Sequence, residues 1–285
     1  VNAAGVWADS VNESFQRVTP FRHVLSKGAS LCIARPPEHR DVLLFDSQKK
    51  DEGMSLRPWG PVSLWGSTET IAPSRHEGFH ADHEDVNDLL EQLNRYMRTP
   101  VGVHDVVSLR CGVRPLVVEK SEQVTDPLAV SRQHRIYLDD RDPWLTVYGG
   151  KITGCERLAV QVRRKISGLF PAPELSAASE AATLLEPELI DHPCMPERVV
   201  SPRWCRDHEQ CLTLQDYLRR RTNIAQWVPR GGLGKHHEYL PDLVRIASVF
   251  SDGDMLAAQR AVDQYAQQVA LHHDAPLGTT LRQPA

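Results

Sequence analysis

The sequence predicts a mixed α/β (α+β) fold: a mixed-sheet domain over residues 1–168, a Pro-rich linker over 169–200 and a small all-helical domain over 201–285. Three observations lead to this prediction. Short apolar or alternating segments, typical of strands, are interspersed with helical stripes up to residue 168. Five prolines then punctuate an Ala/Ser/Glu-rich stretch. Beyond Leu212 the apolar residues recur only at helical spacing.

The first half begins with a short buried strand over 1–4, a turn at Gly5 and a helix over 7–15 with Val11 and Phe15 on its inner face. Runs of apolar or alternating residues predict further strands, at 23–25, 30–34, 41–45, 62–67 and 105–111, with the last ending at Gly112. A helix over 84–97 with Asp82 as its N-cap is expected from five apolar residues at helical spacing: Val86, Leu89, Leu90, Leu93 and Met97.

A strand pair over 136–138 and 144–148 leads into Gly149 and Gly150. The helix expected after them has an apolar stripe made of Leu158, Ala159, Val162, Ile166 and Leu169. In the C-terminal part, Thr213 and Asp216 resemble a capping box. Two more stripes follow there: Leu240, Leu243, Val244, Ala247 and Phe250, then Met255, Ala258, Val262, Tyr265, Ala266 and Val269. The tail from Asp274 is expected to fray.

Composition narrows the function classes. Hydrophobic residues make up 41% and charged residues 25%, as in a soluble globular protein, and no apolar run is long enough to span a bilayer. A net charge of −4 supplies no global basic field for nucleic acid. The six cysteines form no C-x-x-C pair, which favours reduced thiols in a cytoplasmic protein. His76, His80 and His83 stand near Pro73 and Gly78, so we interpret them as loop residues and predict no metal site.

The sharpest motif is Val147–Tyr148–Gly149–Gly150–Lys151–Ile152–Thr153, which predicts a strand, two glycines, a lysine and a helix. Paired glycines let a flat ligand approach the backbone, and the helix N-terminus offers N–H groups and positive potential. Such a place suits a phosphate or the negative edge of a reduced flavin. The alternative is an ordinary strand–turn–helix with a surface lysine.

Two arginines lie in neighbouring motifs. Arg114 is expected between a strand end and Pro115, where its direction is fixed, and Arg132 lies in Ser131–Arg132–Gln133–His134. A guanidinium held in this way binds phosphate or carboxylate through a bidentate fork. For either arginine alone, a pairing with a surface acid is the competing interpretation.

Together these segments resemble the flavin-dependent glycerol-3-phosphate dehydrogenases, of the wider D-amino-acid-oxidase-like flavoprotein group. The resemblance rests on motifs in the family's order: V-N-A-x-G-x-W at 1–7, K-G-x-x at 27–30, a G-T-T-[DE]-like Gly66–Ser67–Thr68–Glu69, G-V-R-P-L at 112–116 and G-G-K-I-T at 149–153. In the last motif Gly154 replaces the family's second Thr, and one extra residue precedes Arg157. The helical part around 213–222 looks like the family's C-terminal domain.

The resemblance implies FAD as cofactor and sn-glycerol 3-phosphate as substrate, oxidised to dihydroxyacetone phosphate with electrons passed to quinone. It implies catalytic roles for Arg114, Arg132 and Lys151, which with Ser30 would also bind substrate. Ten residues would contact the cofactor: Asn2, Ala3, Ala4, Gly5, Trp7, Gly149, Gly150, Lys151, Ile152 and Thr153. A place on the inner face of the cytoplasmic membrane, as a peripheral protein, and a homodimer are compatible with this resemblance.

Two departures from the family pattern keep alternatives open. Ser30 stands where the family commonly has a histidine, and a serine needs its own base; His134 and His23 are nearby in sequence. The sequence also contains no G-x-G-x-x-G fingerprint for a dinucleotide. We therefore expect the C-terminal portion of such an enzyme, which alone retains little FAD. The alternatives are a flavoenzyme acting on another amine or hydroxy acid, and a non-catalytic fragment that serves docking or assembly.

Overall fold

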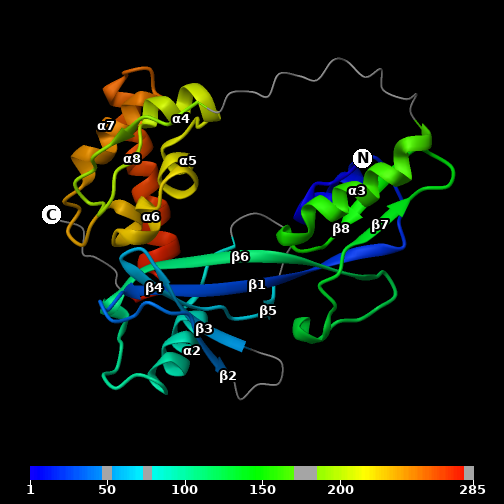
Figure 1. Ribbon diagram of the computed structural model, residues 1–285, viewed down its shortest axis with the longest axis horizontal. Coiled ribbons are helices and arrows are strands. Elements are labelled where there is room, and N and C mark those ends of the chain that lie inside the picture. Colours follow the sequence, from blue (N-terminus) through cyan, green and yellow to red (C-terminus); the bar gives the residue numbers. More distant parts are fainter. Residues whose placement is uncertain (47–52, 73–78, 170–184, 279–285) are drawn as a thin grey trace. The chain divides into compact units, whose positions relative to one another are not determined.

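The computed structural model describes residues 1–46, 53–72, 79–169 and 185–278 (Figure 1). The strands are β1 (Phe21–Ala34), β2 (Leu43–Asp46), β3 (Gly53–Trp59), β4 (Val62–Gly66), β5 (Thr70–Ile71), β6 (Val106–Glu119), β7 (Arg135–Leu138), β8 (Leu145–Tyr148), β9 (Leu189–Ile190) and β10 (Val199–Val200). The α-helices are α1 (Ala8–Ser14), α2 (His83–Asn94), α3 (Cys155–Ile166), α4 (Pro202–Glu209), α5 (Leu214–Asp216), α6 (Ile224–Trp227), α7 (Leu240–Phe250) and α8 (Met255–Val269).

Shorter helical turns connect these elements. They are η1 (Gly5–Trp7), η2 (Val103–Asp105), η3 (Pro127–Ala129), η4 (Ile152–Gly154), η5 (Ser167–Leu169), η6 (Tyr217–Arg221), η7 (Arg230–Gly232) and η8 (Ala270–Asp274). The mixed α/β class expected from the sequence is confirmed. Among the described residues, no helix combines the length and apolar character that crossing a membrane requires.

The largest sheet has the strand order β2-β3-β4-β1-β5, and β6 also pairs with β1. The pairs along this order are antiparallel, and Leu31 of β1 faces Trp65 of β4 in register. Two predicted strands, over 23–25 and 30–34, are one continuous strand, β1. The prediction that a strand ends at Gly112 is wrong, because β6 continues to Glu119. Arg114 therefore lies within a strand, which fixes its side-chain direction more firmly than a loop would.

The described chain groups into two compact units, and each combines separate stretches of sequence. Unit 1 takes in 1–28, 69–79 and 112–184; unit 2 takes in 29–68, 80–111 and 185–285. The long strands β1 and β6 contribute residues to both. The domain boundaries expected at 168 and 200 stay a prediction, and residues 170–184 of the expected linker lie outside the described part of the chain.

In unit 2, helix α2 packs on the large sheet. Its buried Leu89 and Leu93 join Leu31 and Trp65 in one apolar cluster, and the Trp65 indole donates to the Leu89 carbonyl oxygen over 2.9 Å. The predicted N-cap is confirmed: Asp82 accepts the Asp85 backbone N–H, and the Asp85 carboxylate accepts that of Asp82. The helix ends at Asn94, three residues before the expected end.

Replacing Asp82 by alanine is expected to lower the free energy of unfolding by about 1 kcal/mol, because the first turn of α2 loses its side-chain acceptor. Urea denaturation of the two proteins measures the difference. Asp82→Asn keeps an acceptor oxygen and should stay close to the wild type. Equal losses in both variants would contradict a capping role.

The helices from Pro202 onward surround a second apolar core in unit 2. The stripes predicted in α7 and α8 supply Leu243, Ala247, Ala258, Val262, Tyr265 and Val269 to this core. Thr213 caps α5 by accepting the Asp216 N–H, as predicted. Met255 departs from its predicted stripe and is exposed. The prediction of fraying from Asp274 is wrong at that residue, since Asp274 is buried and paired with Arg230.

In unit 1, β7 and β8 form the expected antiparallel hairpin. The predicted strand over 1–4 is reduced to a parallel bridge between Asn2 and Thr146, and Phe15 is exposed rather than inward. No residue of helix α3 is fully buried among the described residues, but Leu158, Val162 and Ile166 of its predicted apolar stripe are half-buried, whereas Ala159 and Leu169 are exposed. Its spacing is amphipathic, but amphipathic spacing shows only that one face can be covered.

Candidate functional site

The glycine motif forms a sharp turn directly after β8, at the start of η4 in unit 1. Gly149 has φ 60° and Gly150 has φ 97°, which side chains rarely adopt. A Cβ at Gly149 would lie 3.2 Å from the Pro115 carbonyl oxygen, and one at Gly150 would lie 3.1 Å from the His134 Cβ. The sequence therefore needs glycine at both positions, for conformation and for space.

Backbone donors follow this turn. Among the described residues, no side chain caps η4 at Lys151 or α3 at Gly154. The Gly154 N–H donates to the Lys151 carbonyl and the Cys155 N–H to that of Ile152, so the N–H groups that could meet a ligand are those of Ile152 and Thr153, at the start of η4. Lys151 itself is exposed.

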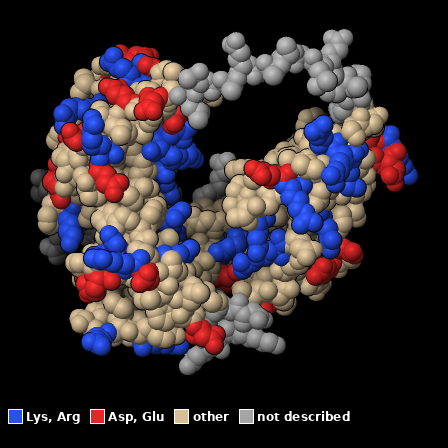
Figure 2. All heavy atoms as spheres, in the orientation of Figure 1, with Lys and Arg blue, Asp and Glu red and all other residues tan. Residues whose placement is uncertain are grey.

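A cavity of about 580 Å³ opens beside the turn. It is lined by residues of the turn, of α3 and of the segment before β7: Arg132, Gln133, His134, Gly150, Lys151, Thr153, Gly154, Arg157, Leu158 and Gln161. Its three cations, Arg132, Lys151 and Arg157, favour an anionic ligand. Figure 2 shows basic side chains gathered on the part of the molecule that holds α3. The last turn of α3 carries three basic residues: Arg163, Arg164 and Lys165.

Arg132 reaches the cavity while paired with Glu69. The Glu69 side chain is almost fully buried and also accepts a hydrogen bond from the Ser26 hydroxyl over 2.9 Å. The pairing with an acid, weighed as the alternative for this arginine, is therefore present. It joins two motifs that lie 63 residues apart and holds one end of the guanidinium in a fixed direction.

Arg114 lies against the Lys27–Gly28 pair of β1. A Cβ on Gly28 would stand 2.4 Å from Nη1 of Arg114, so glycine is required there for the guanidinium to occupy this place. The side chain is half-buried. The two predicted motifs, K-G and G-V-R-P-L, thus meet through one close contact within unit 1.

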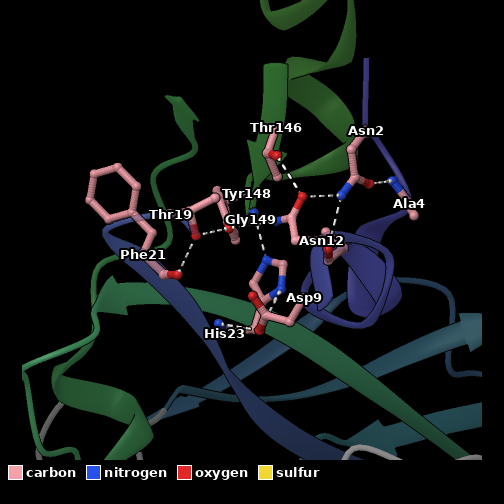
Figure 3. A network of polar contacts seen from close by, with 11 residues as sticks. Asn2, Ala4, Asp9, Asn12, Thr19, Phe21, His23, Thr146, Tyr148 and Gly149 are labelled. Atoms are coloured by element: carbon pink, nitrogen blue, oxygen red, sulfur yellow. Dashed lines mark hydrogen bonds and ion pairs between the residues drawn. The ribbon is translucent and has the colours of Figure 1, made fainter. Parts of the chain in front are cut away.

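The Val1–Trp7 segment has a structural role in its first residues. The Asn2 side chain is buried; it donates to the Ala8 carbonyl and to Asn12 Oδ1, and accepts the Ala4 N–H (Figure 3). Asn2 therefore shapes the turn, and its side chain is occupied. Two other residues predicted to contact the cofactor, Trp7 and Ile152, have exposed side chains. Contact between the ten predicted residues and a flavin stays a prediction.

The candidate bases have different surroundings. Ser30 is buried in β1 and belongs to unit 2, whereas Arg114, Arg132 and Lys151 belong to unit 1. His134 lines the cavity, with Nε2 2.9 Å from Gln161 Oε1. His23 is buried, and its Nε2 accepts the Gly149 N–H over 3.2 Å (Figure 3). His76 lies outside the described residues.

Sequence reasoning missed the polar network beneath the turn. Asn12 donates to the Tyr148 hydroxyl over 2.8 Å, and Thr19 lies 2.6 Å from the same hydroxyl (Figure 3). Burial raises the pKa of the Tyr148 phenol, so this group stays protonated. No spacing in the sequence signals these contacts, because they join residues more than 100 positions apart.

These observations fit FAD. A glycine turn without Cβ atoms suits a flat ring system, and uncapped N–H groups with Lys151 suit its negative edge. Residues 1–153 match the family model described as DAO, FAD dependent oxidoreductase. This match covers more than half of the chain, and the chain belongs to this family of FAD dependent oxidoreductases.

Two relatives show which enzymes the chain is similar to. The chain is 30% identical over 175 residues to D-erythritol 1-phosphate dehydrogenase of Brucella abortus strain 2308, covering 60% of this chain and 34% of that enzyme. It is 25% identical over 181 residues to aerobic glycerol-3-phosphate dehydrogenase of Escherichia coli K12, covering 60% of this chain and 35% of that enzyme. The matched part thus spans about a third of these relatives.

The fold agrees with a solved structure, that of the glycerol-3-phosphate dehydrogenase from Bacillus halodurans complexed with FAD. The TM-score is 0.64 at 16% identity, over 99% of this chain and 63% of that one. The predicted resemblance and fold class are confirmed, and FAD, the expected cofactor, is the one that the family description names.

Replacing Gly150 by alanine is expected to lower the free energy of unfolding by about 1–2 kcal/mol, because its φ of 97° strains any side chain and the new Cβ crowds His134. Chemical denaturation measures this loss. Gly154→Ala is the matched control, since its φ is ordinary and its Cβ would meet open space. A Gly150→Ala variant as stable as this control would refute the strain argument.

Proposed function

We propose that this chain is the C-terminal part of an FAD-dependent dehydrogenase that oxidises sn-glycerol 3-phosphate to dihydroxyacetone phosphate. The observation that supports this most is the cavity beside the glycine turn, with Arg132, Lys151 and Arg157 on its wall. A phosphate monoester of a small polyol matches that charge and size. Relatives named for glycerol 3-phosphate and D-erythritol 1-phosphate share this substrate class.

The proposed chemistry needs a hydride acceptor, a phosphate clamp and a base. FAD, when bound, supplies the hydride acceptor. Arg132 and Lys151 line the cavity; together with Arg114, which the family resemblance adds, they would hold the phosphate dianion through charge-assisted hydrogen bonds and so orient C2 of the substrate. Gly149, Gly150, Ile152 and Thr153 would line the flavin with backbone groups, and Lys151 would offset its negative charge. The hydroxyl proton needs a base, and Ser30 cannot take that role unaided.

D-erythritol 1-phosphate is a second candidate substrate. The relative named for it is 30% identical to this chain, against 25% for the Escherichia coli glycerol-3-phosphate enzyme. The two compounds present the same phosphate and a neighbouring secondary alcohol, so the same cations would serve both. Only the length of the polyol differs.

The proposal extends to the electron acceptor and the place of action. We infer that electrons pass to a quinone and that the whole enzyme works on the inner face of the cytoplasmic membrane. This extension rests on the family resemblance. Sedimentation with vesicles of anionic lipid tests the membrane contact, and reduction of a soluble quinone after substrate addition tests the acceptor.

Loss of the flavin absorbance on addition of substrate tests the activity. The FAD-loaded full-length protein should bleach anaerobically with glycerol 3-phosphate or D-erythritol 1-phosphate, and stay oxidised with amino acids or 2-hydroxy acids. Bleaching only by an amine or hydroxy acid would replace the substrate class. The 285 residues alone should retain little FAD, since they contain no dinucleotide fingerprint. Full retention would contradict the inference that they form only part of the cofactor site.

A further inference from the structure

His23 is a buried histidine that the proposed chemistry does not use. It lies on β1 with a side chain 1% exposed, and its ring centroid is 5.0 Å from that of Tyr148. Its Nε2 accepts the Gly149 N–H over 3.2 Å. The residue thus contacts both the last residue of β8 and the first glycine of the turn, 126 positions away (Figure 3).

This hydrogen bond defines the state of the imidazole. A backbone N–H can only donate, so Nε2 must present its lone pair and the ring proton must sit on Nδ1. Nδ1 faces Asp9, whose Oδ2 lies 3.6 Å away. The same carboxylate oxygen accepts the His23 backbone N–H over 2.8 Å. The Nδ1–Oδ2 distance of 3.6 Å is too long for a hydrogen bond, so Asp9 acts through its negative charge, which favours the tautomer with the proton on Nδ1, and through its bond to the His23 backbone.

We propose that His23, oriented by Asp9, is a positioning residue that holds the Gly149 amide and thereby sets the conformation of the Gly149–Gly150 turn. Consecutive glycines have wide conformational freedom, so the turn needs an external contact to keep one conformation. The bond from Gly149 to His23 supplies such a contact from a rigid strand. That the positioned turn faces the flavin rests on the proposed function. In this role His23 is not the base for the substrate hydroxyl.

Two substitutions separate the acceptor from the volume of the side chain. Glutamine can place an amide oxygen where Nε2 stands, whereas asparagine is shorter and reaches only the Nδ1 position. His23→Asn should therefore leave the Gly149 N–H buried without its acceptor, and His23→Gln should restore it. A lost hydrogen bond of this kind makes local opening about tenfold more frequent.

The experiment uses the 285-residue chain labelled with ¹⁵N at glycine and histidine. A scalar coupling across the hydrogen bond between Gly149 N and His23 Nε2 is expected in the wild type. Exchange of the Gly149 amide should rise about tenfold in His23→Asn and stay within about twofold of the wild type in His23→Gln. Thr19→Val is the matched control, because it removes a hydroxyl from the same network without touching Gly149.

The outcomes are distinct. Absence of the coupling, or equal exchange in the Asn and Gln variants, overturns the proposal. If His23→Asn fails to fold, the coupling and the Gln variant decide. In the FAD-loaded protein, the flavin midpoint potential should shift in His23→Asn and be restored in His23→Gln; an unchanged potential in both overturns the link to the flavin. Failure of the proposed function would appear separately, as no bleaching by any polyol phosphate while the Gly149 coupling persists.

Discussion

In the FAD-loaded enzyme, Arg114→Ala is expected to lower kcat/KM for glycerol 3-phosphate by about a thousandfold. Removing one partner of a desolvated, hydrogen-bonded charge pair costs roughly 2–5 kcal/mol, and about 4 kcal/mol corresponds to this factor. Arg114 is half-buried, and its guanidinium is confined by the strand that bears it and by Gly28. Steady-state kinetics with a quinone acceptor measure the change.

Gly28→Ala tests the position of the Arg114 guanidinium separately from its charge, because displacing this side chain should be the only effect of the substitution. The new Cβ would stand 2.4 Å from Nη1, so the guanidinium must move while its charge remains. We expect KM to rise with little change in unfolding free energy. If Arg114→Ala loses less than tenfold, or if Gly28→Ala leaves KM unchanged, Arg114 does not hold the phosphate.

Asp274→Ala is expected to lower the free energy of unfolding by about 3–5 kcal/mol, the largest stability effect anticipated for this chain. Arg230 donates from Nε and Nη2 to the two oxygens of Asp274, with distances of 3.0 and 2.7 Å, and both side chains are almost fully buried. Alanine would leave the guanidinium buried without its counter-charge. Arg245→Ala is the control, since the Arg245 side chain, paired with Asp242, is itself 74% exposed and its loss should cost less than about 1 kcal/mol. Similar losses in urea denaturation would show that the buried pair contributes no more than a surface one.

The same carboxylate gives the stability a pH dependence of known sign. Burial alone would raise the pKa of Asp274, but hydrogen bonds from His273 and Arg230 outweigh it and hold the pKa below its usual range. A carboxyl with a lower pKa in the folded state stabilises the fold above its unfolded pKa of about 3.9. That contribution is lost as the pH falls through the folded pKa. The acid limb of a stability–pH curve should therefore be flatter in Asp274→Asn, and an unchanged limb would contradict this assignment.

Helices, caps and hairpins were predicted correctly where the residues that specify them lie close together in the sequence. The Asp82 cap, the α7 and α8 stripes and the β7–β8 hairpin follow from spacing within about one element. Strand β3 was missed, because Arg57 and Pro58 interrupt its apolar pattern and only pairing with β2 and β4 makes it a strand. The α3 stripe is only half-buried, at Leu158, Val162 and Ile166, because spacing does not say what covers a face.

By itself, the sequence determined the class of fold, the order of the motifs and the glycine turn, because paired glycines and apolar periodicity act over a few residues. Tertiary structure decided which side chains meet. Glu69 forms an ion pair with Arg132, and the missing side chain of Gly28 leaves space for Arg114. Nε2 of His23 accepts the Gly149 N–H. These contacts cross 63 to 126 positions and depend on strand pairing and register, which residue spacing along the chain does not specify.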